Sequence, residues 1–157
     1  MGGFVMASRL RLYVPALGGI YDKLMPFALP LLRVAIGLIL IPHGAQKLFG
    51  WFGGAGFTRF IQIFESIGYK PGALWVTLVA LTEFVGGILL VLGLFTRAAA
   101  LAVVIFMIVA VHFTSAKGFF WTQQGAEYSL LILVVALVFL IRGGGDYSVD
   151  QKLGREL

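Results

Sequence analysis

Residues 27–49 read FALPLLRVAIGLILIPHGAQKLF, and this stretch decides the fold. Its residues are mostly apolar, and the only charged or titratable side chains are Arg33, His43 and Lys47. A helix needs about 20 mostly apolar residues to cross about 30 Å of hydrocarbon. The stretch is long enough, so we expect it to form a transmembrane helix.

Three further apolar stretches follow, at about residues 73–95, 98–117 and 126–141. The last is short, and we expect Gly125 and Arg142 to form its ends. The predicted fold is therefore all-α, an integral membrane four-helix bundle that occupies residues 27–142. Residues 1–26 are predicted to form a basic cytoplasmic N-terminal arm, and residues 143–157 a cytoplasmic C-terminal tail.

The composition agrees with a membrane protein. The 157 residues are 60% hydrophobic and 12% charged, whereas soluble domains average about half apolar and about a quarter charged residues. The net charge of +5 does not indicate a nucleic-acid partner, because the basic residues flank the apolar stretches. The absence of Cys excludes disulfides, thiolate metal sites and iron–sulfur ligation on this chain.

The basic residues predict the orientation in the membrane. With four crossings, both termini lie on one side, and cytoplasmic segments carry the excess of Lys and Arg. The side of the termini carries seven basic residues, and the other side carries four: Arg9, Arg11, Lys23, Arg97, Arg142, Lys152 and Arg155, against Lys47, Arg59, Lys70 and Lys117. Trp51, Trp75 and Trp121 all fall at the opposite boundary, as in an interfacial aromatic belt. Both termini are therefore predicted to be cytoplasmic.

The first outer loop, residues 50–72, carries a helical pattern of its own. Its apolar residues recur at helical spacing, with polar residues between them: Phe57, Phe60, Ile61, Phe64 and Ile67. The pattern predicts a short helix in the outer interface. This helix either packs on the bundle or forms a lid over a polar site.

Titratable groups inside a bilayer are costly unless they are paired, so each is a candidate for function. A rise of about 1.5 Å per residue places four of them about 18 to 24 Å from the cytoplasmic end of their spans. In order of depth these are Glu83, His112, Glu127 and His43. We predict that they form one cluster in the outer half of the bundle, and that this cluster handles protons and binds the ligand.

Arg33, Gly37, Leu40, Gly44 and Lys47 share one face of the first helix, and the two glycines permit close helix approach. The two cations on this face need counter-charges, and Glu83 and Glu127 are the acids inside the membrane. One interpretation is a set of structural ion pairs. A second is proton transfer by His and Glu, which suits quinone chemistry. Ligation of haem by two His, or of a divalent metal by His and Glu, is a further alternative without a signature spacing, so no metal site is predicted.

The chain resembles the DoxX family of small bacterial membrane proteins. The resemblance rests on four segments in order, from about residue 31 to residue 150: LLRVAIGLILIPHGAQKLFG, LTEFVGGILLVLGLFTRAAA, GAEYSLLIL and GGGDYSVD. The positions that match the family pattern are Arg33, Gly37, His43, Gly44, Lys47, Glu83, Gly86, Gly87, Gly93, Arg97, Glu127, Tyr128, Ser148 and Asp150. The resemblance implies a four-helix membrane bundle in the bacterial inner membrane.

Members of that family are linked to membrane oxidoreductase complexes, including a quinone-reducing one, while others act in export or assembly. The resemblance therefore implies a subunit of a quinone-linked oxidoreductase complex, with other membrane subunits as partners in the lipid bilayer. Quinone is the expected cofactor, and Arg33, Lys47 and Tyr128 are expected to help bind it. The alternative is a non-catalytic subunit that anchors or stabilises a larger complex. A small transporter is a third reading, but the sequence lacks paired halves with interrupted helices.

Overall fold

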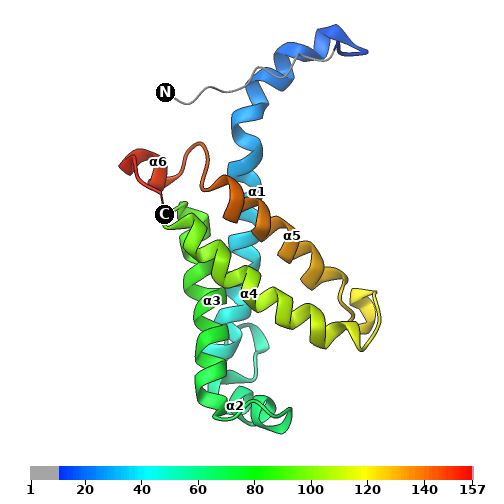
Figure 1. Ribbon diagram of the computed structural model, residues 1–157, viewed down its shortest axis with the longest axis vertical. Helices are drawn as coiled ribbons and strands as arrows, with labels where there is room; N and C mark the ends of the chain where they lie inside the picture. Colours follow the sequence, from blue (N-terminus) through cyan, green and yellow to red (C-terminus); the bar gives the residue numbers. More distant parts are fainter. Residues whose placement is uncertain (1–10, 157) are drawn as a thin grey trace.

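A computed structural model describes residues 11–156 of the chain. All the regular structure in this part is helical (Figure 1). The α-helices are α1 (Gly18–Phe49), α2 (Gly56–Ser66), α3 (Gly72–Leu92), α4 (Thr96–Ser115), α5 (Glu127–Arg142) and α6 (Val149–Leu153). Three single 3-10 turns, η1 (Pro15–Leu17), η2 (Trp51–Gly53) and η3 (Trp121–Gln123), lie in the connections. The predicted all-α class is confirmed, while the first ten residues of the predicted N-terminal arm lie outside the described residues.

Three helical segments of the described chain are long and apolar enough to cross a membrane. They are Pro15–Phe49, Gly72–Leu92 and Thr96–Ser115. Helix α5 is apolar but has 16 residues, fewer than the about 20 that a straight crossing needs. The fold is that of a helical membrane bundle, and a fourth crossing by α5 stays a prediction.

The bundle consists of two antiparallel helix pairs that cross each other obliquely (Figure 1). Helices α1 and α3 form one pair, and α4 and α5 form the other. The α1–α3 pair is close because glycines face each other. A Cβ atom added at Gly37 would lie 2.6 Å from the carbonyl oxygen of Gly87, and one added at Gly44 would lie 2.5 Å from the backbone nitrogen of Phe84. Small residues at such contacts let two membrane helices pack backbone to backbone.

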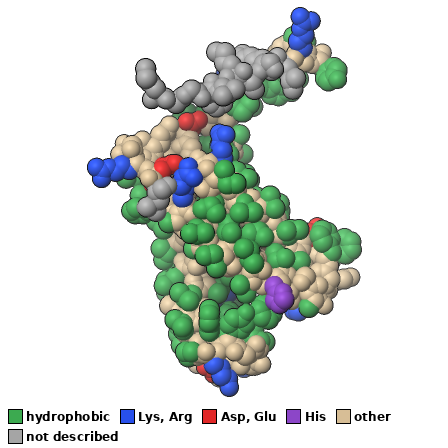
Figure 2. Space-filling model, viewed as in Figure 1, with side chains coloured by type: hydrophobic (Ala, Val, Ile, Leu, Met, Phe, Trp, Pro, Cys, Tyr) green, Lys and Arg blue, Asp and Glu red, His purple; other side chains and the backbone are tan. Residues whose placement is uncertain are grey.

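The core lies where the two pairs cross. Leu40, Leu90, Val103 and Phe139, one from each of the four long helices, are almost fully buried there. The outward faces are also apolar, and residues such as Leu131 are largely exposed. Figure 2 shows hydrophobic side chains over the middle of the visible face, with Lys and Arg gathered toward the ends of the molecule. An apolar exterior of this extent fits lipid contact.

Helix α1 differs from the prediction, which placed its start near Phe27. It begins at Gly18, and its N-terminal half projects beyond the bundle (Figure 1). At about 1.5 Å per residue its 32 residues span about 48 Å, more than the hydrocarbon needs. The apolar stretch of residues 27–49 is the part of the helix that fits the hydrocarbon of a membrane. The helix itself begins earlier and includes the polar residues Asp22 and Lys23.

The short helix predicted in the loop of residues 50–72 is confirmed as α2. Phe57, Phe60 and Phe64 are half-buried on its inner face, while Arg59 and Gln62 are exposed. The helix packs on α3 and α1. Its end is tied to the start of α3, because the backbone N–H of Gly72 donates to the Glu65 carboxylate at 3.0 Å.

Candidate functional site

An ion pair joins α1 to α3 inside the bundle. Lys47 Nζ lies 2.6 Å from Glu83 Oε2. The Glu83 side chain is 5% exposed and the Lys47 side chain 13% exposed. Lys47 Nζ also donates to the carbonyl oxygen of His43, one helical turn earlier, at 3.3 Å. This arrangement confirms that Glu83 supplies the counter-charge for one of the two cations on the polar face of α1.

The local packing explains why these two side chains meet. The glycine contacts at Gly37 and Gly44 bring the α1 and α3 backbones together, so a side chain one turn beyond Gly44 reaches α3 directly. The Phe60 ring of α2 lies 5.5 Å from Lys47 Nζ, within the range of a cation–π contact. Helix α2 therefore helps to cover the ion pair.

A small hollow beside Glu83, here called the polar pocket, lies between the two helix pairs. It has a volume of about 160 Å³ and is lined by residues of α1, α3, α4 and α5: Leu40, His43, Glu83, Phe106, Met107, Ala110, Tyr128, Ser129 and Ile132. The rings of His43 and Tyr128 lie 6.3 Å apart, centre to centre. The pocket thus brings a carboxylate, an imidazole, a phenol and a hydroxyl to an otherwise apolar wall.

Two of the predicted cluster residues lie elsewhere. Glu127 accepts a hydrogen bond from the backbone N–H of Trp121 at 3.1 Å, so it stabilises its own loop at the start of α5. His112 is exposed on α4, with its ring 5.6 Å from that of Phe113. The depths along each helix matched, but depth alone does not fix the direction in which a side chain points. Within residues 11–156, no three His, Asp or Glu side chains are placed to hold a metal ion.

Arg33 does not pair with either of the intramembrane acids, which corrects the expected pairing. Its guanidinium donates to the carbonyl oxygens of Gly144 and Tyr147, the latter at 3.2 Å, and the residue is 2% exposed. The physical reason is distance along α1. Arg33 and Lys47 are separated by about 21 Å of helix, so a shared face does not give them a shared site.

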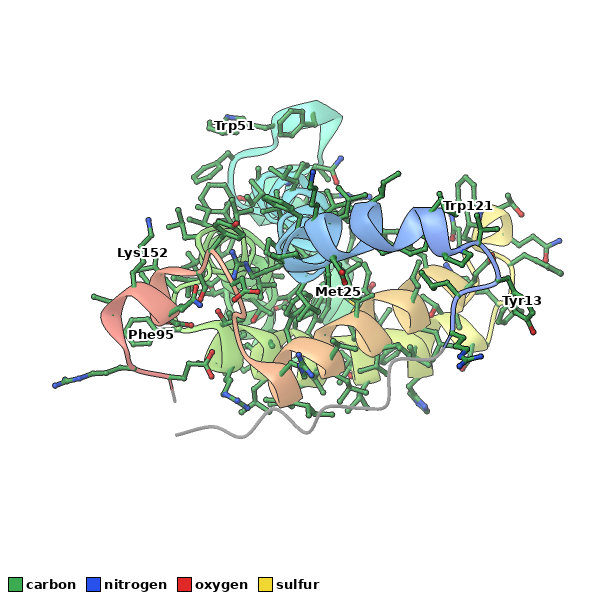
Figure 3. The ribbon with its side chains drawn as sticks, turned by 90° about the horizontal axis from the view of Figure 1, so that it is seen from above. Tyr13, Met25, Trp51, Phe95, Trp121 and Lys152 are labelled. Carbon is green, nitrogen blue, oxygen red and sulfur yellow. The ribbon has the colours of Figure 1, made fainter. Side chains whose placement is uncertain are left out.

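Arg33 belongs instead to a second polar site, here called the C-terminal clasp and formed by Arg33, Gly93, Thr96, Gly144 and Asp150. The Asp150 carboxylate accepts hydrogen bonds from the backbone N–H groups of Phe95 at 2.8 Å and Thr96 at 2.9 Å. The backbone N–H of Asp150 in turn donates to the Gly93 carbonyl at 2.9 Å. In Figure 3, Phe95 and Lys152 lie at the same side of the molecule, where α6 meets the turn between α3 and α4.

The clasp explains the glycine at position 93. Gly93 has a φ of +67°, and a Cβ there would lie 2.6 Å from Arg33 Cζ. A larger residue at this position would therefore displace the Arg33 side chain.

Arg97 adds further contacts beside the clasp. It donates to the carbonyl oxygens of Leu140 and Ile141, both at 2.9 Å, and to the Glu156 carboxylate at 3.3 Å. Sequence reasoning missed the clasp, although Gly93, Arg97, Ser148 and Asp150 had all been singled out by their match to the family pattern.

The fold and the two polar sites together define a helical membrane protein with buried charges. A DoxX domain matches residues 28–116, which is more than half of the chain. The chain belongs to the DoxX family.

Three relatives are similar along most of their length. An uncharacterized protein of Haemophilus influenzae is 31% identical over 83% of this chain and 94% of its own length. An uncharacterized membrane protein of Mycobacterium tuberculosis is 32% identical over 79% of this chain and 80% of its own length. The putative oxidoreductase CatD of Bacillus subtilis is 31% identical over 76% of this chain and 82% of its own length. No solved structure matches the chain.

Proposed function

We propose that this chain is a membrane subunit of an oxidoreductase complex in the bacterial inner membrane, and that it binds the ring of a quinone in the polar pocket. The observation that carries the proposal is that His43, Glu83 and Tyr128 all line one small hollow. Lys47, which does not line it, forms an ion pair with Glu83. The name of the relative in Bacillus subtilis, a putative oxidoreductase, supports the same class.

The size and chemistry of the polar pocket suit a quinone ring. An engineered apolar cavity of about 150 Å³ holds benzene, and the polar pocket has a volume of about 160 Å³. A quinone carries two carbonyl oxygens, which accept hydrogen bonds. The His43 imidazole, the Tyr128 phenol and the Ser129 hydroxyl can all donate. Leu40, Phe106 and Ile132 supply apolar contacts for the ring between them.

Reduction of a quinone to a quinol takes two electrons and two protons. Glu83 and His43 are the titratable groups of the polar pocket that exchange protons near neutral pH when their surroundings tune them. The chain has no Cys to ligate an iron–sulfur cluster, and in this proposal a partner subunit supplies the electrons. In this proposal Lys47 holds Glu83 in place, while Arg33, His112 and Glu127 take no part in ring binding.

A structural role is the second candidate, favoured by the contacts of the buried charges. The Lys47–Glu83 pair ties α1 to α3, and Arg33 ties α1 to the C-terminal segment. Under this reading the polar groups serve only to lock the helices, and the chain anchors a larger complex without binding a cofactor.

Purification in native lipid separates the two candidates. We expect a quinone to co-extract with the wild-type chain, and to be depleted in His43→Ala and in Tyr128→Phe. His112→Ala is the matched control, because His112 is exposed, as His43 is, but does not line the polar pocket. A stoichiometric protein partner together with no quinone in any preparation would reject quinone binding and favour the structural role.

A further inference from the structure

A second, larger hollow lies on the membrane-facing side of α3 and α4, and it is here called the apolar groove. It has a volume of about 440 Å³, and its walls come from α2, the loop after it, α3 and α4. Along α3 the wall is formed by Trp75, Leu78, Val79 and Thr82. Along α4 it is formed by Ala102, Ile105, Phe106, Val109, Ala110 and Phe113. A groove with this lining suits a hydrocarbon chain.

The apolar groove and the polar pocket share a wall. Phe106 and Ala110, one turn apart on α4, line both hollows. On α3, Val79 of the groove lies one turn before Glu83 of the pocket, on the same face of the helix. The two hollows therefore lie side by side along the seam between α3 and α4, with Phe106 and Ala110 between them.

We propose that the apolar groove binds the prenyl tail of the quinone whose ring occupies the polar pocket. This inference rests on the proposed function. One molecule with a small polar ring and a long apolar tail fits both hollows in order. Such a ligand reaches the pocket laterally from the membrane, between α3 and α4 and past Phe106.

The lining of the polar pocket fits this ligand better than it fits a phospholipid. A phospholipid chain in the groove would bring a phosphate toward the adjoining pocket, whose lining within the described part of the chain contains no Lys or Arg to pair with it. Lys47 is already paired with Glu83 at 2.6 Å, so this pair offers no spare positive charge. The quinone ring is uncharged and carries only hydrogen-bond acceptors, so it needs no counter-charge there.

Lipid tails are as apolar as the groove, so the tail is held there by fit and contact rather than by transfer out of water. The position of the tail is therefore the quantity to measure. The full chain in lipid nanodiscs is photolabelled with two quinone probes that have the same ring and three prenyl units. One probe carries its diazirine on the ring and the other on the last prenyl unit, and the labelled peptides are mapped by mass spectrometry.

In the wild-type chain, we expect the ring probe to label α3 near Glu83 and α5 near Tyr128. The tail probe should label residues 75–82 of α3 and 105–113 of α4, and excess unlabelled quinone should suppress both. Tail labelling spread evenly over the exposed helix faces, or unaffected by excess quinone, would overturn the groove inference while ring labelling upheld the proposed function. Absence of competed ring labelling would reject the proposed function itself.

A groove-filling variant makes the test independent of the labelling chemistry. Ala102→Trp should lower tail labelling of the groove about tenfold, with ring labelling changed by less than about twofold. The matched control is Leu101→Trp, which adds an indole at the neighbouring position of α4, where the side chain is 46% exposed and does not line the groove. Equal tail labelling in the two variants would contradict the inference, and the wild-type map remains decisive if Ala102→Trp does not assemble.

Discussion

Lys47 Nζ and Glu83 Oε2 lie 2.6 Å apart and join the two most closely packed helices of the bundle, α1 and α3. Both side chains are largely buried, and the Phe60 ring of α2 lies over the Lys47 ammonium group. An ion pair in this setting is worth little beyond the cost of burying it, but removal of one partner leaves an uncompensated buried charge. The pair therefore gives a clear test of what holds α1 against α3.

Glu83→Gln should destabilise the bundle by about 3–5 kcal/mol, because Lys47 stays buried without its counter-ion. The measurement is thermal or denaturant unfolding of the purified chain in nanodiscs. The double variant Lys47→Met with Glu83→Gln should recover much of the loss, since neither charge is then left alone. Glu127→Gln is the matched control on another helix, and it should cost much less. Additive losses in the double variant would show that the two residues do not act as a pair.

The glycines of the α1–α3 contact give a second prediction. Gly44→Ala should destabilise the fold by about 1–3 kcal/mol, because the new Cβ would lie 2.5 Å from the backbone nitrogen of Phe84 and force the helices apart. Gly86→Ala should be tolerated, since Gly86 is also buried but has nothing within 4 Å of an added Cβ. Unfolding of the two variants side by side checks this, and equal losses would contradict the proposed close contact.

Asp150 gives a third prediction. Asp150→Ala removes the acceptor of two backbone N–H groups, those of Phe95 and Thr96, at the start of α4. Each buried donor left without a partner costs about 1–3 kcal/mol. We expect residues 143–156 to detach from the turn between α3 and α4, and the detached segment to become sensitive to protease.

The control for Asp150 is Asp146→Ala. Asp146 lies in the same segment, but its carboxylate accepts an exposed hydrogen bond from Gln151 Nε2 at 3.2 Å. Protease sensitivity should stay at the wild-type level in this variant. If Asp150→Ala is equally resistant, the clasp is not what holds the C-terminal segment.

The apolar stretches predicted the helices well, because the length and hydropathy of a span follow directly from the sequence. The helical spacing of Phe57, Phe60 and Phe64 likewise predicted α2, and the shared face of α1 correctly placed Lys47 toward an acid of α3. These predictions depend on local pattern alone, and local pattern is what a single sequence contains.

The positions of Arg33, His112 and Glu127 could not be predicted in the same way. Matched depth suggested one cluster, but the rotation of each helix about its axis decides which side chains face each other. For α1 and α3 that rotation is set by the close backbone contacts at Gly37 and Gly44, whereas His112 and Glu127 lie on the other helix pair. The partners of Arg33 are backbone carbonyls of a segment more than one hundred residues away in the chain, and a carbonyl leaves no signal in the sequence.

The orientation in the membrane is the last prediction. The C-terminal clasp ties Asp150 to the start of α4, so the chain after α5 returns to the level at which α4 begins. An α5 that crosses together with its flanking loop residues fits this return, and it gives an even number of crossings. The excess of Lys and Arg at that end then favours a cytoplasmic position for both termini.

Because the chain contains no Cys, single-Cys variants can be labelled in intact cells with a membrane-impermeant maleimide. Lys70→Cys and Trp121→Cys should react from outside the cell, because both positions are exposed on the predicted outer side. Asp146→Cys, which is at the opposite end, should react only after the membrane is opened. Labelling of Asp146→Cys in intact cells together with Lys70→Cys would mean that α5 does not cross the membrane. The reverse pattern at all three positions would invert the predicted orientation.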